Sequence, residues 1–334
     1  MKYIYYLSFV VLFYSCSEDY PEYLGSSLND QFGELAIVDS LVANSSTFDF
    51  SDQSSKYFSA RWSKNLQWVL TITGTESGAV KTFTGFDNKI DIDNTQWIGT
   101  ADDFPSFSYE SCIAELTLDD NENTIVLETG VTISELKAMQ EGMVVIADFD
   151  NGYPQNYVEF VQSGESMNFN INYGGAAQGE GFYSMGGIVN WDYYLGSLKI
   201  ASDISSLDGI PSSLFYFNMA VIGGQAGQVP TDQFIKVICR EDDNETYVYE
   251  INPVDWSEWR LSSIPYDDFE LEGNATNNQR DPSSITLIEV MCLSCPSGPG
   301  PIAGGGEPCT DNENLVVKTN IDYITFTTNE PYQP

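Results

Sequence analysis

The chain has 334 residues, enough for about two domains of ~150 residues each, and carries 49 Asp and Glu against 13 Lys and Arg. Its formal net charge of −36 repels phosphate backbones, so we expect no nucleic-acid partner. It contains no His, which excludes His-based triads, general bases and metal ligands. Hydrophobic residues make up 42% of the chain, which predicts a folded core rather than a disordered acidic tail.

The first 16 residues form a candidate targeting segment. Lys2 precedes an apolar run from Tyr3 to Tyr14, which is too short to span a membrane and is typical of a signal peptide. Ser15 and Cys16 resemble a bacterial lipobox, and this resemblance implies lipidation of Cys16. The alternative is an ordinary secretory signal with an incidental cysteine.

A polar, acidic segment follows at residues 17–30 and is expected to be a tether. Its first residues, Ser17, Glu18 and Asp19, resemble the export signal of Bacteroidetes surface lipoproteins. That resemblance implies a lipid-anchored protein at the cell surface of the outer membrane, without a transmembrane helix. The alternative is that these residues are only an acidic spacer.

Residues 31–140 alternate as β-strands do. Trp68, Leu70 and Ile72 share one face of a strand, and Ala114, Leu116 and Leu118 repeat the pattern between Gly, Asp and Asn clusters. The pattern predicts a β-sandwich. The unit resembles an Ig-like module through Trp97-Ile-Gly99 and the Cys112 strand. The spacing of Ile133, Leu136 and Met139 predicts one short helix at its end.

Residues 143–334 predict a second all-β unit. About eight strands are expected, which fits a jelly-roll sandwich, and Leu214 to Ile222 is apolar on both faces, as in a central strand. Residues 295–309 form a Pro/Gly-rich loop that is expected on the surface.

Four segments of this second unit resemble the galactose-binding-like jelly-roll superfamily of carbohydrate-binding modules. They are Asp148 to Gly152, Gly181 to Gly196, Val254 to Phe269 and Ile321 to Phe326. The resemblance implies a polysaccharide or oligosaccharide ligand.

Aromatic residues in the Gly181–Gly196 segment are the first candidates for sugar binding. Sugar recognition requires flat apolar rings beside polar groups that bind hydroxyls. The segment is expected to be a loop that exposes its rings, although any single ring can instead plug the sandwich core. The candidate carbohydrate-binding residues are Tyr183, Trp191, Tyr193, Tyr194, Trp256, Asn218 and Arg240. Trp256 is equally compatible with a binding platform and with an edge cover.

Three acidic residues lie on the expected first and last strands of the second unit. Asp148, Asp150 and Asp322 would be neighbours if these strands pair, and the family resemblance implies a structural Ca²⁺ nearby. The alternative is two exposed acidic strand ends.

Six cysteines are present, and lipidation of Cys16 would leave five. We expect an extracellular disulfide staple from Cys295 or Cys292 to Cys309. A zinc site would lack a fourth ligand, and a redox C-x-x-C motif would lack its βαβ context. Cys239 is expected to pack as a buried apolar group.

The sequence predicts that the protein is not an enzyme. It contains no nucleophile elbow, HExxH motif or P-loop, and 49 acidic residues make chance carboxylate pairs common. The leading hypothesis is a surface lipoprotein that captures polysaccharide by aromatic stacking for an outer-membrane importer. The alternatives are a structural or adhesive lipoprotein that binds other proteins, and a hydrolase.

Overall fold

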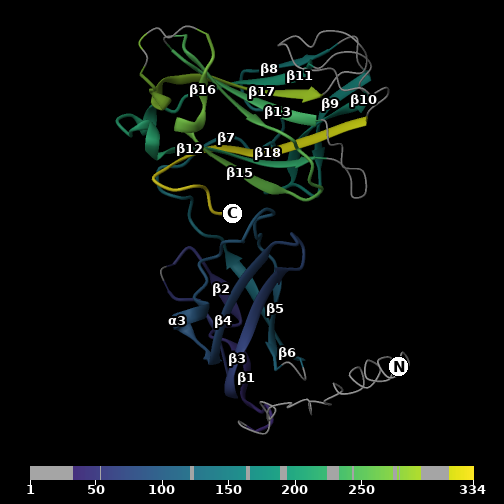
Figure 1. Cartoon of the computed structure of the whole chain (residues 1–334), viewed down its shortest axis with the longest axis vertical. Coiled ribbons are helices and arrows are strands. Elements are labelled where there is room, and N and C mark those ends of the chain that lie inside the picture. Colours follow the sequence, from purple (N-terminus) through teal and green to yellow (C-terminus); the bar gives the residue numbers. More distant parts are fainter. Residues whose placement is uncertain are drawn as a thin grey trace, which may run out of the picture.

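The computed structural model describes residues 33–334 except 53, 121–123, 163–165, 189–193, 224–232, 243, 274–276, 278 and 295–315. Figure 1 shows two β units one above the other. The first unit contains β1 (Ile37–Ala43), β2 (Thr47–Asp49), β3 (Phe58–Gly74), β4 (Val80–Ile90), α3 (Ile92–Thr95), β5 (Ser111–Asp119) and β6 (Thr124–Glu135). These strands form sheet A in the order β1-β3-β5-β6-β2, and β4 pairs with β3.

Strand β3 organises this first unit. Its residues alternate between buried and solvent-facing along almost all of its length, because one face of sheet A covers the core. Trp68, Leu70 and Ile72 are at most 2% exposed, which confirms the face predicted for them. The all-β expectation is confirmed for this unit, and its Ig-like identity stays a prediction.

The short helix predicted around Ile133, Leu136 and Met139 is wrong. Strand β6 continues to Glu135, and residues 136–142 form a non-helical link to the second unit. Ile133 is buried because it pairs with Phe48 of β2. Pairing with a neighbouring strand satisfies the backbone there and overrides the helical spacing of the apolar residues.

The second unit is a sandwich of two six-stranded sheets. Sheet B has the order β15-β12-β18-β10-β9, with β7 paired to β18, and sheet C has the order β16-β14-β13-β17-β11-β8. The strands are β7 (Val144–Ala147), β8 (Tyr157–Val161), β9 (Ser166–Tyr173), β10 (Gly181–Ile188), β11 (Tyr194–Ala201), β12 (Phe215–Gly223), β13 (Gln233–Glu241), β14 (Thr246–Ile251), β15 (Arg260–Pro265), β16 (Glu270–Leu271), β17 (Ile285–Ser294) and β18 (Val316–Thr328).

The core of the second unit lies between sheets B and C. Strand β12 is buried along nearly its whole length, which confirms the central strand predicted at residues 214–222. Short 3-10 helices, Ser205–Leu207, Ser212–Leu214, Tyr266–Asp268 and Pro282–Ser284, connect the strands. Cys239 and Cys292 are free thiols and are fully buried in this core. Of the two expected staples only Cys295–Cys309 therefore remains, and it lies outside the described residues.

The expected aromatic loop at residues 181–196 is instead built largely of strands. Residues 181–188 form β10, residues 194–201 form β11, and residues 189–193 lie outside the described part. The glycines that suggested a loop allow close backbone packing. A Cβ on Gly181 would collide with the Phe149 carbonyl oxygen, and one on Gly187 would collide with that of Ser166.

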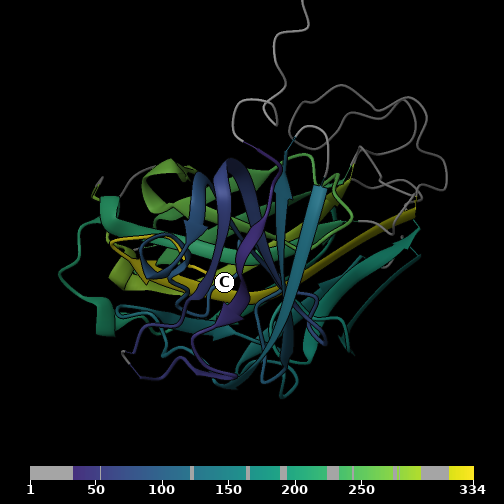
Figure 2. The ribbon, with the colours of Figure 1, turned by 90° about the horizontal axis from the view of Figure 1, so that it is seen from below.

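The two units meet at one end of sheet B. A small apolar cluster joins them, in which Phe104 of the first unit stacks on Tyr332, with ring centroids 5.8 Å apart, and lies 6.3 Å from the Tyr323 ring. The backbone N–H of Leu261 also donates to Asp103 at 2.7 Å. The C-terminal end of the chain lies between the units in Figure 1 and near the middle of the view along the long axis in Figure 2. Within the described ranges, no helix is long and apolar enough to cross a membrane.

Candidate functional site

Tyr183 does not present its ring to solvent, contrary to the expectation. It lies on the inner side of β10 with no exposed surface, and its ring stacks on Phe149 at 5.7 Å. Its hydroxyl donates to Glu159 Oε2 at 2.7 Å. Burial, followed by the hydrogen bond to Glu159, raises the pKa of Tyr183 well above its ordinary value. Its position is a consequence of strand alternation, which points every second residue of β10 into the sandwich.

Asn218 also has a structural role. Its side chain is fully buried on β12, where Ser263 Oγ donates to its carbonyl oxygen at 2.6 Å and the backbone N–H of Tyr332 donates at 3.2 Å. Its amide donates to Thr327 Oγ1 at 3.1 Å. These bonds tie β15, β18 and the C-terminal tail together, so this side chain is not available to a ligand.

Trp256 behaves as an edge cover rather than as a free platform. Its indole N–H donates to the carbonyl of Val221 at 2.9 Å, and its half-buried ring packs against the core of the second unit. The guanidinium of Arg260 lies 5.4 Å from the ring centroid. Trp259 is half-buried against the cluster between the units and donates to the carbonyl of Gly175 at 2.8 Å.

The remaining aromatic candidates lie at or near the start of β11. Trp191 and Tyr193 are outside the described residues. Tyr194 is half-buried, and its ring stacks on Phe160 of β8, with centroids 5.3 Å apart and planes 13° from parallel. Phe160 is 42% exposed, so this pair presents an aromatic surface to solvent. The hydroxyl of Tyr194 lies 2.9 Å from Ser197 Oγ.

Strand register places this ring pair on the outer face of sheet C. Paired residues of antiparallel strands point to the same side, so each row across the sheet shares one face. The row through Ser197 contains Phe160, Ser197, Met291 and Lys236. The next row contains Val158, Lys199, Glu289 and Ile238, and the one after it contains Ala201, Leu287 and Arg240. We call these three rows and Tyr194 the sheet C face.

A buried carboxylate forms the polar centre of the sheet C face. Glu289 is only 6% exposed, although it points away from the core between Ile288 and Val290. Ser197 Oγ donates to Glu289 Oε1 at 2.7 Å, and Lys199 Nζ lies 3.4 Å from Glu289 Oε2. Since an unpaired buried charge is strongly unfavourable, these contacts hold the carboxylate in one position. The rings of Phe160 and Tyr194 lie beside this network through Ser197.

Basic residues gather on the same face. Residues 143–334 contain six Lys and Arg, and Lys199, Lys236 and Arg240 all point outward from sheet C. Arg240 is exposed, as its candidate role requires. Together the face offers flat rings, a fixed carboxylate and several N–H donors, which are the groups that bind the apolar faces and hydroxyls of sugars.

Sequence reasoning missed Phe160, Ser197, Lys199 and Glu289. Glu289 is the single charged residue in the apolar strand β17. A lone charge inside an apolar strand is a sequence signal that could have identified it. The stack of Phe160 on Tyr194 joins residues 34 positions apart, and only the pairing of β8 with β11 brings them together.

The three candidate metal ligands lie where the first and last strands of the second unit pair, as expected from sequence. Asp150 Oδ1 accepts from the backbone N–H of Glu180 and Gly181, at 2.6 and 2.9 Å. Asp322 accepts three backbone N–H bonds, from Ala177, Gln178 and Tyr323. Burial raises the pKa of Asp322 to about 8, against the opposite effect of these bonds.

Backbone donors therefore occupy much of the coordination capacity of these carboxylates. In the described ranges no three Asp, Glu, Cys or His side chains converge as a metal-binding group. Asp148 Oδ1 accepts from the backbone N–H of Asp150, at 3.3 Å. The calcium site stays a prediction.

Comparison with known proteins adds distant structural similarities. No protein-family model and no curated protein matches the chain. A family 11 carbohydrate-binding module from Clostridium thermocellum, solved with a β-1,3-1,4-mixed-linked tetrasaccharide, is 15% identical, with a TM-score of 0.37, and the match covers 57% of this chain and 98% of that one. The CBM22-1 xylan-binding domain of Paenibacillus barcinonensis Xyn10C is 11% identical, with a TM-score of 0.31, over 57% of this chain and 98% of that domain. An exo-β-agarase is 12% identical, with a TM-score of 0.34, over 57% of this chain and 26% of the agarase.

Proposed function

We propose that this protein is a non-catalytic glycan-binding protein and that its ligand lies on the sheet C face. The observation that carries the proposal is the exposed stack of Phe160 on Tyr194 beside the fixed Glu289 carboxylate. A pyranose ring lies with its C–H face on the aromatic rings while its hydroxyls bond to Glu289 and Lys199. The backbone scaffold is rigid β-sheet, so binding orders few groups.

Binding by this face needs no second carboxylate opposite Glu289, whereas glycosidase catalysis needs a pair of carboxyl groups ~5–9.5 Å apart on either side of one bond. Glu272 is held in an ion pair with Lys236 at 2.6 Å. Glu250 and Glu270 lie on β14 and β16, two and three strands away from the strand of Glu289.

The anchoring and cellular role belong to the same proposal. Lipidation at Cys16 would hold the protein at the outer membrane, with the second unit exposed at the cell surface. There it would retain polysaccharide near an outer-membrane importer. Affinity for a single site is expected in the micromolar to millimolar range, because few rings are buried and hydroxyls exchange water for protein.

Affinity gel electrophoresis on plant, algal and host polysaccharides tests the proposal. We expect retardation on at least one polysaccharide, and we expect Phe160→Ala to reduce it by about tenfold in affinity. Tyr173→Ala is the matched control, because Tyr173 is 61% exposed but lies on β9 of sheet B. Equal loss in both variants would contradict the site.

Two other results would replace the proposed function. Retention on no polysaccharide, together with capture of a defined surface protein, would favour the structural or adhesive alternative. Release of reducing sugar from a bound polysaccharide would identify a hydrolase.

A further inference from the structure

A cavity of about 680 Å³ lies between the two units. The first unit lines it with residues 105–109 and the link at 136–143, and the second unit with residues 175–180, Tyr323 and the C-terminal tail. This volume is within the range of about 300–1,000 Å³ that small-molecule sites occupy. Ligand sites are also common where two domains meet.

The walls of this interdomain cavity are tied together across the boundary. Gln140 Nε2 donates to the carbonyls of Glu330 and Pro331, each at 3.3 Å, and Lys137 Nζ donates to the carbonyl of Gln333. The backbone N–H of Ser106 donates to Ala177 at 2.9 Å. The cavity is therefore a built feature of the packed boundary between the units.

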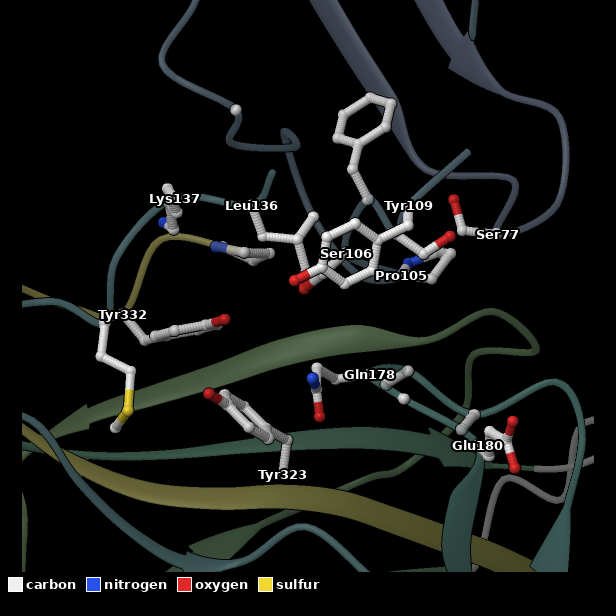
Figure 3. Close-up of a pocket in the computed structure, with 18 of the residues that line it drawn as sticks. Ser77, Pro105, Ser106, Tyr109, Leu136, Lys137, Gln178, Glu180, Tyr323 and Tyr332 are labelled. Atoms are coloured by element: carbon white, nitrogen blue, oxygen red, sulfur yellow. The ribbon is translucent and has the colours of Figure 1, made fainter. Parts of the chain in front are cut away.

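Aromatic and thioether groups line the cavity without being covered. Tyr109 is 62% exposed and Met139 is 65% exposed, although both are large residues beside an apolar cluster. Figure 3 shows Tyr109 reaching into the space from the first unit, with Tyr323 and Tyr332 on the opposite side. Burial of apolar surface is favourable, so the exposed surface of Tyr109 and Met139 does not contribute to the stability of the fold. This surface is therefore available to a ligand.

Two amide groups in the cavity wall lack a hydrogen bond that they need. Among the described residues, no donor reaches the buried Oε1 atom of Gln178 or that of Gln140. The orientation of Gln140 is set, because its Nε2 already donates to two carbonyls. A buried acceptor without a donor is unfavourable, but both oxygens are covered by protein atoms. Figure 3 shows the Gln178 amide with its nitrogen toward the cavity, so a ligand meets this side chain through Nε2, or through Oε1 once the amide turns over.

The charges around the cavity favour a neutral occupant. Glu76 and Glu180 line it, and Lys137, the one cation among the described lining residues, already donates to the carbonyl of Gln333. Burial lowers the pKa of Lys137 to about 8. An anionic ligand would meet two carboxylates without a free positive partner.

We propose that this interdomain cavity is a second binding site, which takes a neutral polyhydroxylated ligand of mono- or disaccharide size. The Tyr109 ring provides a flat apolar surface for the C–H face of a sugar ring. A hydroxyl group of the ligand accepts a hydrogen bond from the side-chain amide of Gln178. Because the walls come from both units, the bound ligand also holds the units together.

The methionines of this chain provide a direct test. Met139 and Met143 line the cavity, Met291 lies on the sheet C face, and Met185 and Met219 are buried in the core. The full chain, labelled with ¹³C-methyl methionine, is titrated with glucose, galactose, mannose, xylose and cellobiose up to about 50 mM, because single-sugar affinities are expected to be millimolar. We expect saturable shifts of the Met139 and Met143 signals with at least one sugar, and unchanged Met185 and Met219 signals.

Two variants assign the effect to the proposed contacts. Tyr109→Ala and Gln178→Leu are each expected to weaken binding about five- to tenfold, since the first removes a ring and the second removes a hydrogen-bonding amide. Phe86→Ala is the control, because Phe86 is 64% exposed but lies on β4 opposite Gln67, outside the cavity lining, and this variant is expected to leave the affinity unchanged. Because Tyr109 is largely exposed, its replacement leaves the core intact.

The readouts separate this site from the sheet C face. No saturable Met139 or Met143 shift with any of the five sugars would overturn the second site and leave a water-filled cavity. Shifts there that survive both Tyr109→Ala and Gln178→Leu would overturn it as well. Shifts confined to Met291 with longer oligosaccharides would support the proposed function and contradict this inference. Shifts confined to Met139 and Met143 would support this inference and contradict binding at the sheet C face.

Discussion

Ser197 Oγ donates a 2.7 Å hydrogen bond to Glu289 Oε1, and its own oxygen lies 2.9 Å from the hydroxyl of Tyr194. One fully buried hydroxyl therefore links the aromatic part of the sheet C face to its charged part. Hydrogen bonds that share a charged partner reinforce one another in a low-dielectric site. Through Ser197, the position of the ring depends on the position of the carboxylate.

Tyr194→Phe tests this link. The variant keeps the ring that stacks on Phe160 but removes the hydroxyl beside Ser197. We expect a loss of affinity of about threefold to tenfold for the retained polysaccharide, smaller than that of Tyr194→Ala, because one hydrogen bond contributes about 1 kcal/mol. Affinity gels of both variants provide the measurement. Unchanged affinity in Tyr194→Phe would show that the ring alone matters, and equal losses in the two variants would show that the hydroxyl carries the whole effect.

Glu289→Gln separates charge from shape on the same face. The amide keeps the volume of the carboxylate, but it loses the ionic contact with Lys199 and the charged acceptor. We expect about tenfold weaker glycan binding, because hydrogen bonds to charged groups contribute about 1.5–3 kcal/mol. Lys199 is partly exposed and remains solvated, so the melting temperature should change little. A large fall in melting temperature with unchanged affinity would assign Glu289 a structural role.

Asn218→Ala is expected to affect folding and not binding. It removes the acceptor for Ser263 and for the backbone of Tyr332, and the donor to Thr327, all in a fully buried place. Leaving such groups unpaired costs about 1–3 kcal/mol each, so we expect a loss of about 2–4 kcal/mol in the free energy of unfolding. Urea denaturation measures it. Weaker glycan binding by the folded variant, without destabilisation, would contradict this structural assignment.

Glu110 makes the first unit sensitive to acid. Burial raises its pKa, but hydrogen bonds from the Ser77 hydroxyl and from the backbone N–H groups of Ser108, Ser77 and Glu76 outweigh burial and lower the pKa below 4.5. The folded state therefore binds the proton less tightly than the unfolded chain, and this stability is present above pH 4.5 and lost as the pH falls.

The matched variant for this prediction is Glu110→Gln. We expect it to reduce the free energy of unfolding at pH 7, and to flatten the decline in stability between pH 5 and pH 3 relative to the original chain. Urea denaturation across that range is the measurement. Parallel pH profiles for the two proteins would show that other carboxylates dominate the acid response.

Calcium binding at the pairing of β7 with β18 is a separate prediction. If Asp150 and Asp322 hold the ion, about 1 mM CaCl₂ should raise the melting temperature by several degrees over the same protein in EDTA, because the ion binds only the folded state. Asp150→Asn should abolish that increase. An identical melting temperature in CaCl₂ and EDTA would show that these carboxylates serve only backbone N–H groups, those of residues 177–181 and of Tyr323.

The strand pattern of this chain was accessible from sequence, because alternation is a local property. Trp68, Leu70 and Ile72 lie on the predicted buried face, and β12 is the predicted central strand. The sequence also placed Arg240 outward and Cys239 inward. The prediction of a helix at Ile133 was wrong, because strand pairing with β2 outweighed the helical spacing of three apolar residues.

The sequence by itself determined that this chain is acidic, lacks His and alternates as β-strands do, because charge and alternation need no knowledge of distant contacts. Only the tertiary structure decided which rings meet solvent. Tyr183 and Tyr194 look alike in sequence, but the sheets turn one into the core and stack the other on Phe160. The Glu289 network and the interdomain cavity likewise exist only after folding, because strand pairing and the packing of two units bring together residues that are distant in the chain.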